Sequence, residues 1–181
     1  VKADTNIFAA WKSALNEEGA RIVSARTGQK VFWSKDPNAF MEILYPDDLA
    51  IAQAKATNDT SIVSKLVFGG HSLLFTGDIT KWVEQKLVER GVNVRSDILK
   101  VPHHGSKYSS SEAFLAAVAP STAVIQVGAK NTYGHPTQEV LSRLGNISVL
   151  RTDQNGDILI QSNGTKFSSF QNKKGGVREE I

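Results

Sequence analysis

Two short polar motifs, each directly after an apolar run, constrain the fold of this chain most strongly. Thr76-Gly77-Asp78 follows the apolar residues 73–75, and the sequence Pro-His-His-Gly-Ser at 102–106 follows the apolar pair at 98–99. Both apolar runs are typical of strands, so an aspartate and a histidine pair would each lie at the end of a strand. Rigid strands that hold such side chains beside open loops are typical of a metal-dependent hydrolase.

The composition is typical of a single globular domain. The 181 residues suffice for one domain, and no apolar run approaches the roughly 20 residues that span a bilayer. We therefore expect the chain itself to be soluble, while its first residue, Val1, leaves open that it is cut from a longer protein. The absence of cysteine excludes disulfides and thiolate metal sites. A net charge of +3 is compatible with a polyanionic substrate but is far below that of a dedicated DNA-binding domain.

Hydrophobic spacing predicts an alternation of strands and helices. Helices are expected over residues 6–18, 80–90 and 112–118, as a turn within 49–56, and from His135-Pro136 to about residue 144. Strands are expected at residues 21–24, 30–33, 40–45, 61–68, 72–76, 97–101, 123–127, 148–151, 157–161 and 165–167. Together these elements predict a mixed α/β layered fold.

Turn signals and aromatic residues add detail to this prediction. The Asn-Gly pairs at 155–156 and 163–164 are strong hairpin signals. His71 falls in another expected hairpin turn, where we expect it to be solvated. The three tryptophans fall on apolar faces and are expected in the core. Residues 171–181 are polar and are expected to form a frayed tail.

A longer series of motifs in the same order resembles one known family. Its members are Asn58-Asp59-Thr60-Ser61, Phe75-Thr76-Gly77-Asp78, Lys100-Val101-Pro102-His103-His104-Gly105-Ser106, Gly128, Asn131, Tyr133-Gly134-His135-Pro136, Arg151-Thr152-Asp153 and Gly156. From about residue 8 to residue 167, the chain resembles the metallo-β-lactamase-fold domain at the C-terminus of the ComEC family, the DNA-uptake channels of natural competence. The pairing of Thr-Gly-Asp with Pro-His-His-Gly-Ser is specific for this branch of the fold.

The resemblance implies a fold, a cofactor and an activity. The fold would be an αββα sandwich with a metal site at the lip between two sheets. Two divalent ions, Zn²⁺ or Mn²⁺, would serve hydrolysis of DNA, and Asp78 would be the carboxylate that bridges them. One of His103 and His104 would be a metal ligand and the other would contact the scissile phosphate. The sequence leaves that choice open, with His103 slightly preferred as the ligand.

The resemblance also implies a cellular setting. The domain would belong to a larger membrane channel protein and would lie on the extracytoplasmic face of the cell membrane, where DNA is its substrate. No transmembrane segment is recognisable in this chain.

The chain departs from the family pattern in one respect. The first metal motif of the family, His-x-His-x-Asp-His, belongs before the first helix and is absent from this sequence. We therefore expect residues 1–170 to form a partial domain that lacks the N-terminal portion with most of the ligands. Such a chain alone would hold at best one weakly bound metal ion, or none.

Further candidates line the expected site, each with a simpler alternative. Ser106, with the serines at 109–111, suits phosphate binding at a helix N-terminus or an ordinary helix cap. Asn58 is a site-lining residue or a plain turn residue. Tyr133 and His135 are candidates for substrate contact, and His135 is alternatively a helix N-cap.

The motif residues have simpler alternatives of their own. Asp78, between a strand and a helix, is alternatively a helix cap. His103 and His104 are alternatively two surface histidines beside a proline.

Three functions follow from these expectations. The first is a metal-dependent DNA phosphodiesterase. The second is a non-catalytic fragment or remnant of the same fold that binds DNA or a partner. The third keeps the hydrolase and changes its substrate to another ester or a lactone.

Overall fold

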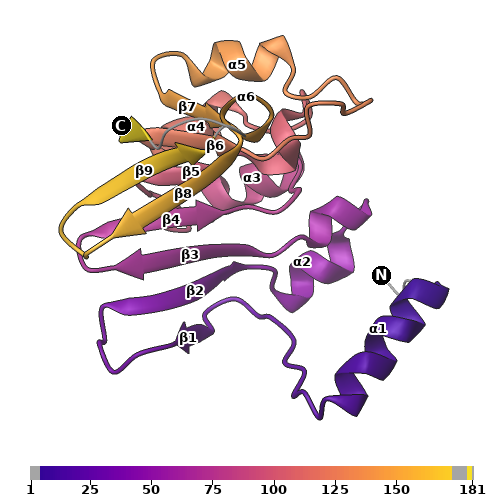
Figure 1. Cartoon of the computed structure of the whole chain (residues 1–181). Coiled ribbons are helices and arrows are strands. Elements are labelled where there is room, and N and C mark those ends of the chain that lie inside the picture. Colours follow the sequence, from indigo (N-terminus) through magenta and orange to yellow (C-terminus); the bar gives the residue numbers. More distant parts are fainter. Residues whose placement is uncertain (1–4, 173–178, 181) are drawn as a thin grey trace.

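The structure is a computed structural model that describes residues 5–172, 179 and 180 (Figure 1). Its helices are α1 (Asn6–Glu17), α2 (Asp48–Gln53), α3 (Lys81–Glu89), α4 (Glu112–Val118), α5 (Gln138–Leu144) and α6 (Thr152–Asn155), with 3-10 turns η1 (Thr57–Thr60) and η2 (Pro102–Gly105). Its strands are β1 (Lys30–Phe32), β2 (Ala39–Tyr45), β3 (Val63–Phe68), β4 (His71–Phe75), β5 (Ile98–Lys100), β6 (Thr122–Ile125), β7 (Ser148–Arg151), β8 (Asp157–Ser162), β9 (Phe167–Asn172) and β10 (Glu179–Glu180).

Strands β1 to β7 form one sheet in chain order. The pairs from β1 to β4 are antiparallel, and the pairs from β4 to β7 are parallel. Helices α3, α4 and α5 make the crossovers between the parallel strands, as parallel pairing requires. Because these strands run the same way, the loops that follow β4, β5 and β6 emerge at one edge of the sheet.

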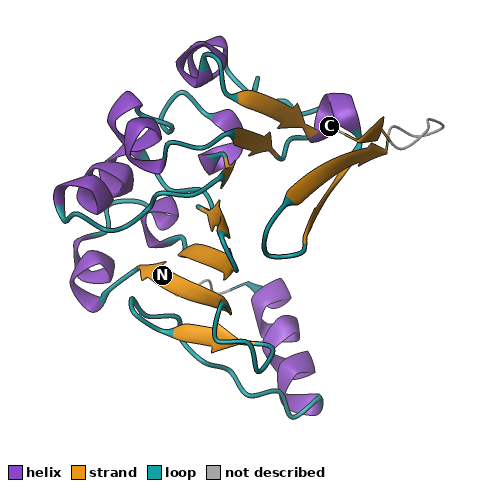
Figure 2. Cartoon of the chain, turned by 90° about the vertical axis from the view of Figure 1, so that its left-hand side faces the viewer, coloured by secondary structure: helices purple, strands orange, loops and turns teal. Residues whose placement is uncertain are grey.

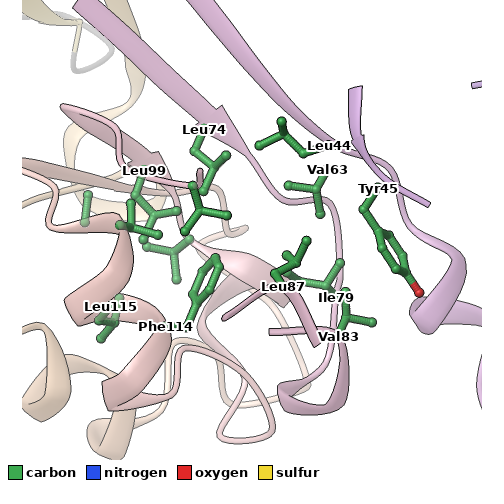
Figure 3. Packing of buried hydrophobic residues seen from close by; sticks show 14 of the residues in the cluster. Leu44, Tyr45, Val63, Leu74, Ile79, Val83, Leu87, Leu99, Phe114 and Leu115 are labelled. Carbon is green, nitrogen blue, oxygen red and sulfur yellow. The ribbon is translucent and has the colours of Figure 1, made fainter. Parts of the chain in front are cut away.

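The helices lie mainly on one face of this sheet. Figure 2 shows α2 to α5 on one side, while the β8–β9 hairpin and α1 lie on the other. The core fills the space between the sheet and its helices, where Leu74 and Leu99 pack with Phe114, Val83 and Leu87 (Figure 3). The mixed α/β layered architecture predicted from the sequence is therefore confirmed.

The β8–β9 hairpin forms a second small sheet with β10. Its turn is anchored on the β3–β4 turn, where the Gly70 N–H donates to the Gly164 carbonyl at 2.8 Å. A Cβ atom on Gly69, at φ +58°, would lie 2.3 Å from that same carbonyl oxygen, so this contact requires glycine. An apolar groove of about 360 Å³ lies between the hairpin and the sheet.

Several predicted elements differ from the observed ones. Residues 21–24 form no strand, because nothing in the described chain pairs with them. The helix predicted from His135 begins at Gln138, with Thr137 as its N-cap. The Asn-Gly pair at 155–156 ends α6 and leads from one sheet to the other, so it closes no hairpin.

The predicted frayed tail, residues 171–181, lies mostly outside the described residues. Where it is described, it is paired strand: residues 171–172 belong to β9, and Glu179 and Glu180 pair with β9 as β10.

The aromatic residues divide between core and surface. Trp82 packs against the core, whereas the core prediction is wrong for Trp11 and Trp33, which are 51% and 54% exposed. Trp11 stacks on Phe8 of its own helix, and none of the 12 residues of α1 is buried. His71 is not simply solvated, since both of its ring nitrogens are buried without a hydrogen-bond partner among the described residues.

None of the described helices has the length and apolarity needed to cross a membrane.

Candidate functional site

The candidate residues gather where three parallel strands end. Asp78 follows β4, the His103-His104 pair follows β5, and the loop with Tyr133 and His135 follows β6. These strands pair directly with one another, so their loops form one edge of the sheet. In open α/β sheets, ligands bind at this carboxyl edge.

Asp78 and His104 face each other across this edge. His104 Nε2 lies 3.6 Å from Asp78 Oδ1, and both side chains are partly exposed. His104 Nδ1 lies 2.6 Å from the Gln126 carbonyl oxygen, which can only accept a hydrogen bond. The proton of the neutral ring is therefore held on Nδ1, and Nε2 presents its lone pair beside the carboxylate, as in a metal-ligating histidine. Asp78 is not a helix cap, since Thr80 occupies the N-cap of α3.

His103 turns away from this pair. Its Nε2 lies 3.4 Å from Asn58 Nδ2. Its ring packs edge-on against the His135 ring, with 5.9 Å between the two ring centroids. The Tyr133 ring in turn stacks on His135 at 6.0 Å. Asn58, His103, His135 and Tyr133 thus form a second group beside the Asp78–His104 pair. The structure brings His104, and not the slightly preferred His103, to the aspartate.

An unusual backbone separates the two histidines. His103 and His104 have φ angles of 49° and 54°, in the left-handed region that non-glycine residues rarely occupy. A strand would point adjacent side chains to opposite faces of the sheet, whereas this conformation keeps both histidines at the same edge with different partners. Such strain costs on the order of 1–3 kcal/mol a residue and persists only where surrounding contacts hold it.

Those contacts converge on the Gly77 carbonyl. It accepts the His103 N–H at 3.2 Å and the Lys100 ammonium at 3.2 Å. Thr76 Oγ1 donates to the Lys100 carbonyl at 2.7 Å, and the Asp78 N–H donates to Ser61 Oγ at 3.3 Å. The loops after β4 and β5 are therefore bonded to each other directly.

Burial and charge change two pKa values here. Burial lowers the pKa of His135, and the neighbouring His103 and His104 lower it further. Burial also lowers the pKa of Lys100, against the opposing effect of the Asp78 carboxylate.

Sequence reasoning missed the residues that support the site. Asp59, 3% exposed, accepts from the N–H groups of Lys55 and Ala56 and from Thr80 Oγ1 at 2.6 Å, which fixes the turn that carries Asn58. The sequence marks Lys100 only as the start of the histidine motif. Their positions in the sequence are the one signal that could have identified them as supporting residues. Asp59 directly follows Asn58, and Lys100 is the first residue of the histidine motif.

Ser106 is buried within the loop that follows η2. It is 2% exposed, and its hydroxyl accepts from the Tyr108 N–H at 3.4 Å. The N–H groups of Ser110 and Ser111 donate to the buried carboxylate of Glu84, so they are already occupied. Ser111 itself is the N-cap of α4. Of the two alternatives for this loop, the helix cap describes the observed contacts.

The described residues offer part of a metal site. Within residues 5–172, 179 and 180, no group of three or more histidine, aspartate and glutamate side chains is arranged to hold a metal ion. Asp78 and His104 supply two donors, whereas a catalytic zinc site uses three protein ligands and a water. The donor set therefore does not fit a complete metal centre.

Comparison of the chain's sequence with known proteins indicates its family. No family model matches the sequence. The chain is 40% identical to ComE operon protein 3 of Bacillus subtilis (strain 168) over 147 residues, which are 80% of this chain and 18% of that protein. It is 45% identical to competence protein ComA of Neisseria gonorrhoeae over 102 residues, 55% of this chain and 15% of that protein. It is 33% identical to recombination protein 2 of Haemophilus influenzae over 150 residues, 77% of this chain and 18% of that protein.

The chain thus spans less than a fifth of the length of each of these relatives. All three are ComEC-family competence proteins. Over the matched portion, this chain belongs to the ComEC family of competence proteins.

Proposed function

We propose that this chain supplies part of the active site of a metal-dependent DNA phosphodiesterase within a competence protein. The observation that carries the proposal is the Asp78–His104 pair, in which the Gln126 carbonyl fixes the proton on Nδ1 and leaves Nε2 free toward the carboxylate. A carboxylate and a neutral imidazole are ligands for Zn²⁺ and Mn²⁺. Family membership supports DNA as the substrate.

The second group would hold the substrate. Asn58, His103, His135 and Tyr133 lie beside the metal-ligand pair and carry amide, imidazole and phenol donors. His103 Nδ1 and His135 Nδ1 are buried without a hydrogen-bond partner among the described residues. Buried polar atoms are normally satisfied, so these two nitrogens mark a group whose hydrogen-bond partners are missing among the described residues. Tyr133, 82% exposed, is placed to meet the substrate from solvent.

The metal centre would be completed by donors outside the described set. Two divalent ions, once fully coordinated, would lower the pKa of a bound water and stabilise charge on the phosphate. In this proposal the domain is part of a larger membrane protein and meets DNA on the extracytoplasmic face of the membrane.

One observation favours a second function. With two donors in place among the described residues, the chain would bind DNA or a partner through the same edge without cleaving anything. This non-catalytic alternative shares the surface and differs in the chemistry.

One experiment separates the two functions. We would measure the metal content of the purified chain by elemental analysis and Mn²⁺-dependent cleavage of single-stranded DNA, for the unaltered chain, for Asp78→Ala and for Asp36→Ala. Asp36 is an exposed turn residue that serves as the control. Bound metal and cleavage that are lost only in Asp78→Ala support the phosphodiesterase. DNA binding without metal or cleavage in the unaltered chain would instead show that this chain alone carries half a site, and would leave binding as its own function.

A further inference from the structure

Lys100 occupies an unusual place between the two motif loops. It is the last residue of β5, and its ammonium donates to the Gly77 carbonyl at 3.2 Å and approaches the Val101 carbonyl at 3.5 Å. Gly77 directly precedes Asp78, and Val101 leads into the histidine motif. One side chain therefore contacts the backbone of both loops.

The backbone of Lys100 is held by the same partner loop. Its carbonyl accepts from Thr76 Oγ1 at 2.7 Å, so Lys100 is tied to the Thr76-Gly77-Asp78 loop at two points. The Gly77 carbonyl that it contacts also accepts the N–H of His103, one of the two strained residues. The ammonium thus acts on the atom through which the two loops are joined.

Burying a charged ammonium at a strand end costs desolvation free energy, which an apolar side chain in the same space would not cost. Lys100 is partly buried, and it lines the cavity between the sheet and β8 together with Gln126, whose carbonyl orients His104. A methionine of similar length would fill the same space without desolvating a charge. What the ammonium adds is a charge-assisted hydrogen bond to the Gly77 carbonyl, which is stronger than a neutral one.

Lys65 offers a comparison within the same sheet. It lies on β3, and burial lowers its pKa as it does for Lys100. Lys65 lines a polar cavity with Arg95 and Asp97, away from the motif loops. A half-buried lysine is therefore not unique to the site, but contact with both motif loops distinguishes Lys100 from Lys65.

We propose that Lys100 is a positioning residue, which through the Gly77 carbonyl sets the Asp78 loop and the His103-His104 loop at the separation that the site requires. The proposal deepens the proposed function and rests on it for its purpose, although its geometry can be tested without any activity.

The test uses the four histidines of the chain as reporters. Imidazole resonances would be recorded by NMR for the unaltered chain, Lys100→Met, Lys100→Arg and Lys65→Met, and assigned with single histidine substitutions. Lys100→Met should displace the His103 and His104 signals and leave His71, at the start of β4, in place. Lys100→Arg, which keeps cationic donors, should displace them less. Lys65→Met should leave them unchanged.

Mn²⁺ titration of the same samples adds a functional readout. In the unaltered chain, Mn²⁺ should broaden the His104 signal, and Lys100→Met should raise the dissociation constant about tenfold, the effect expected when a support of a metal ligand is removed. Thermal unfolding, followed in parallel, should stay cooperative. If Lys100→Met does not fold, Lys100→Gln, which removes the charge and keeps a polar side chain, takes its place with the same expected displacement.

The outcomes separate the two proposals. His103 and His104 signals that coincide in Lys100→Met and the unaltered chain would overturn the role of Lys100, and so would an equal displacement in Lys65→Met. If Mn²⁺ broadens no histidine signal in the unaltered chain, Asp78 and His104 hold no metal ion by themselves, while the resonance shifts still decide whether Lys100 positions the two loops.

Discussion

Glu84 shows how one buried side chain can shape a loop that is distant in sequence. It lies on α3, is fully buried, and accepts from the N–H groups of Ser110 and Ser111 just before α4. Ser110 has a φ angle of 57°, so the carboxylate also supports a strained residue. Arg143 donates to the carbonyls of Ser109 and Ser110 from the other side. The loop that follows the histidine motif is therefore held through its N–H groups by Glu84 and through its carbonyl groups by Arg143.

Replacing Glu84 with alanine should destabilise the chain by about 3 kcal/mol, because two buried N–H groups lose their acceptor. Glu84→Gln, which keeps one acceptor oxygen, should cost less. Urea unfolding measures both, and the control is Glu89→Ala on the exposed end of the same helix, where we expect a change of no more than about 0.5 kcal/mol. Equal losses for the alanine variants at 84 and 89 would contradict this account.

The same residues show what sequence patterns can and cannot predict. Asp78, His103, His104 and His135 were placed together correctly, because the carboxyl ends of neighbouring parallel strands share an edge. The supporting contacts were missed, because the Glu84 contact with Ser110 spans 26 residues and no local pattern marks it. The direction of each histidine was also beyond reach, since it depends on a left-handed backbone stabilised by tertiary hydrogen bonds.

At the scale of elements, the turn η2 and the loop after β6 fit together through Gly105. Gly105 has φ +81°, and a Cβ atom there would lie 2.6 Å from Pro136 Cβ. The Thr137 N–H donates to the Gly105 carbonyl at 2.9 Å. This contact brings the loop with His135 against the histidine motif.

Gly105→Ala should therefore separate the two loops and lower stability by about 3 kcal/mol, the combined cost of a strained φ and of overpacking. The His103 and His135 resonances should both shift. Gly128→Ala is the matched control, because a Cβ atom at Gly128 meets nothing within 4 Å and its φ is not in the left-handed region. An unchanged His135 signal in Gly105→Ala would show that the two loops are held by other contacts.

The helix α1 is the element least connected to the rest. It has a cap, because Thr5 Oγ1 accepts from the Phe8 N–H, but none of its residues is buried. Sequence periodicity predicted this helix correctly and its packing wrongly, since an amphipathic pattern shows that a face is apolar and not what covers it.

Removal of residues 1–19 should change the free energy of unfolding by no more than about 0.5 kcal/mol, as for other surface changes. Limited proteolysis should cut first between residues 19 and 29, which carry little regular structure. Urea denaturation of the intact and shortened chains provides the measurement. A clearly lower midpoint for the shortened chain would show that α1 packs on the remainder in solution.

At the scale of the whole molecule, one phenol links an antiparallel strand, β2, to the turn η1 that carries Asn58. Tyr45, 2% exposed at the end of β2, donates to the Asp59 carbonyl at 2.5 Å. Burial, followed by the nearby Asp59 and Asp47 carboxylates, raises the pKa of Tyr45 to about 12.

The folded chain should therefore lose stability at alkaline pH. An unfolded tyrosine releases its proton near a pKa of about 10, so between about 10 and 12 the folded state binds more protons than the unfolded state. The free energy of unfolding should fall as the pH rises through this window. Tyr45→Phe should remove that part of the pH dependence, and Tyr133→Phe, at an exposed position, should not. Identical alkaline profiles for Tyr45→Phe and the unaltered chain would refute the assignment.

Strand pairing changes from antiparallel to parallel at β4, and the two parts of the sheet also differ in how many candidate site residues they carry. Most of the candidate site residues come from loops after β4, β5 and β6, while β1 to β3 contribute only Asn58, through the turn before β3. Insertions in the β1–β2 connection should therefore leave the arrangement of the candidate residues unchanged. The same division makes the segment from η1 onward the unit that carries the whole candidate site when segments are exchanged between relatives.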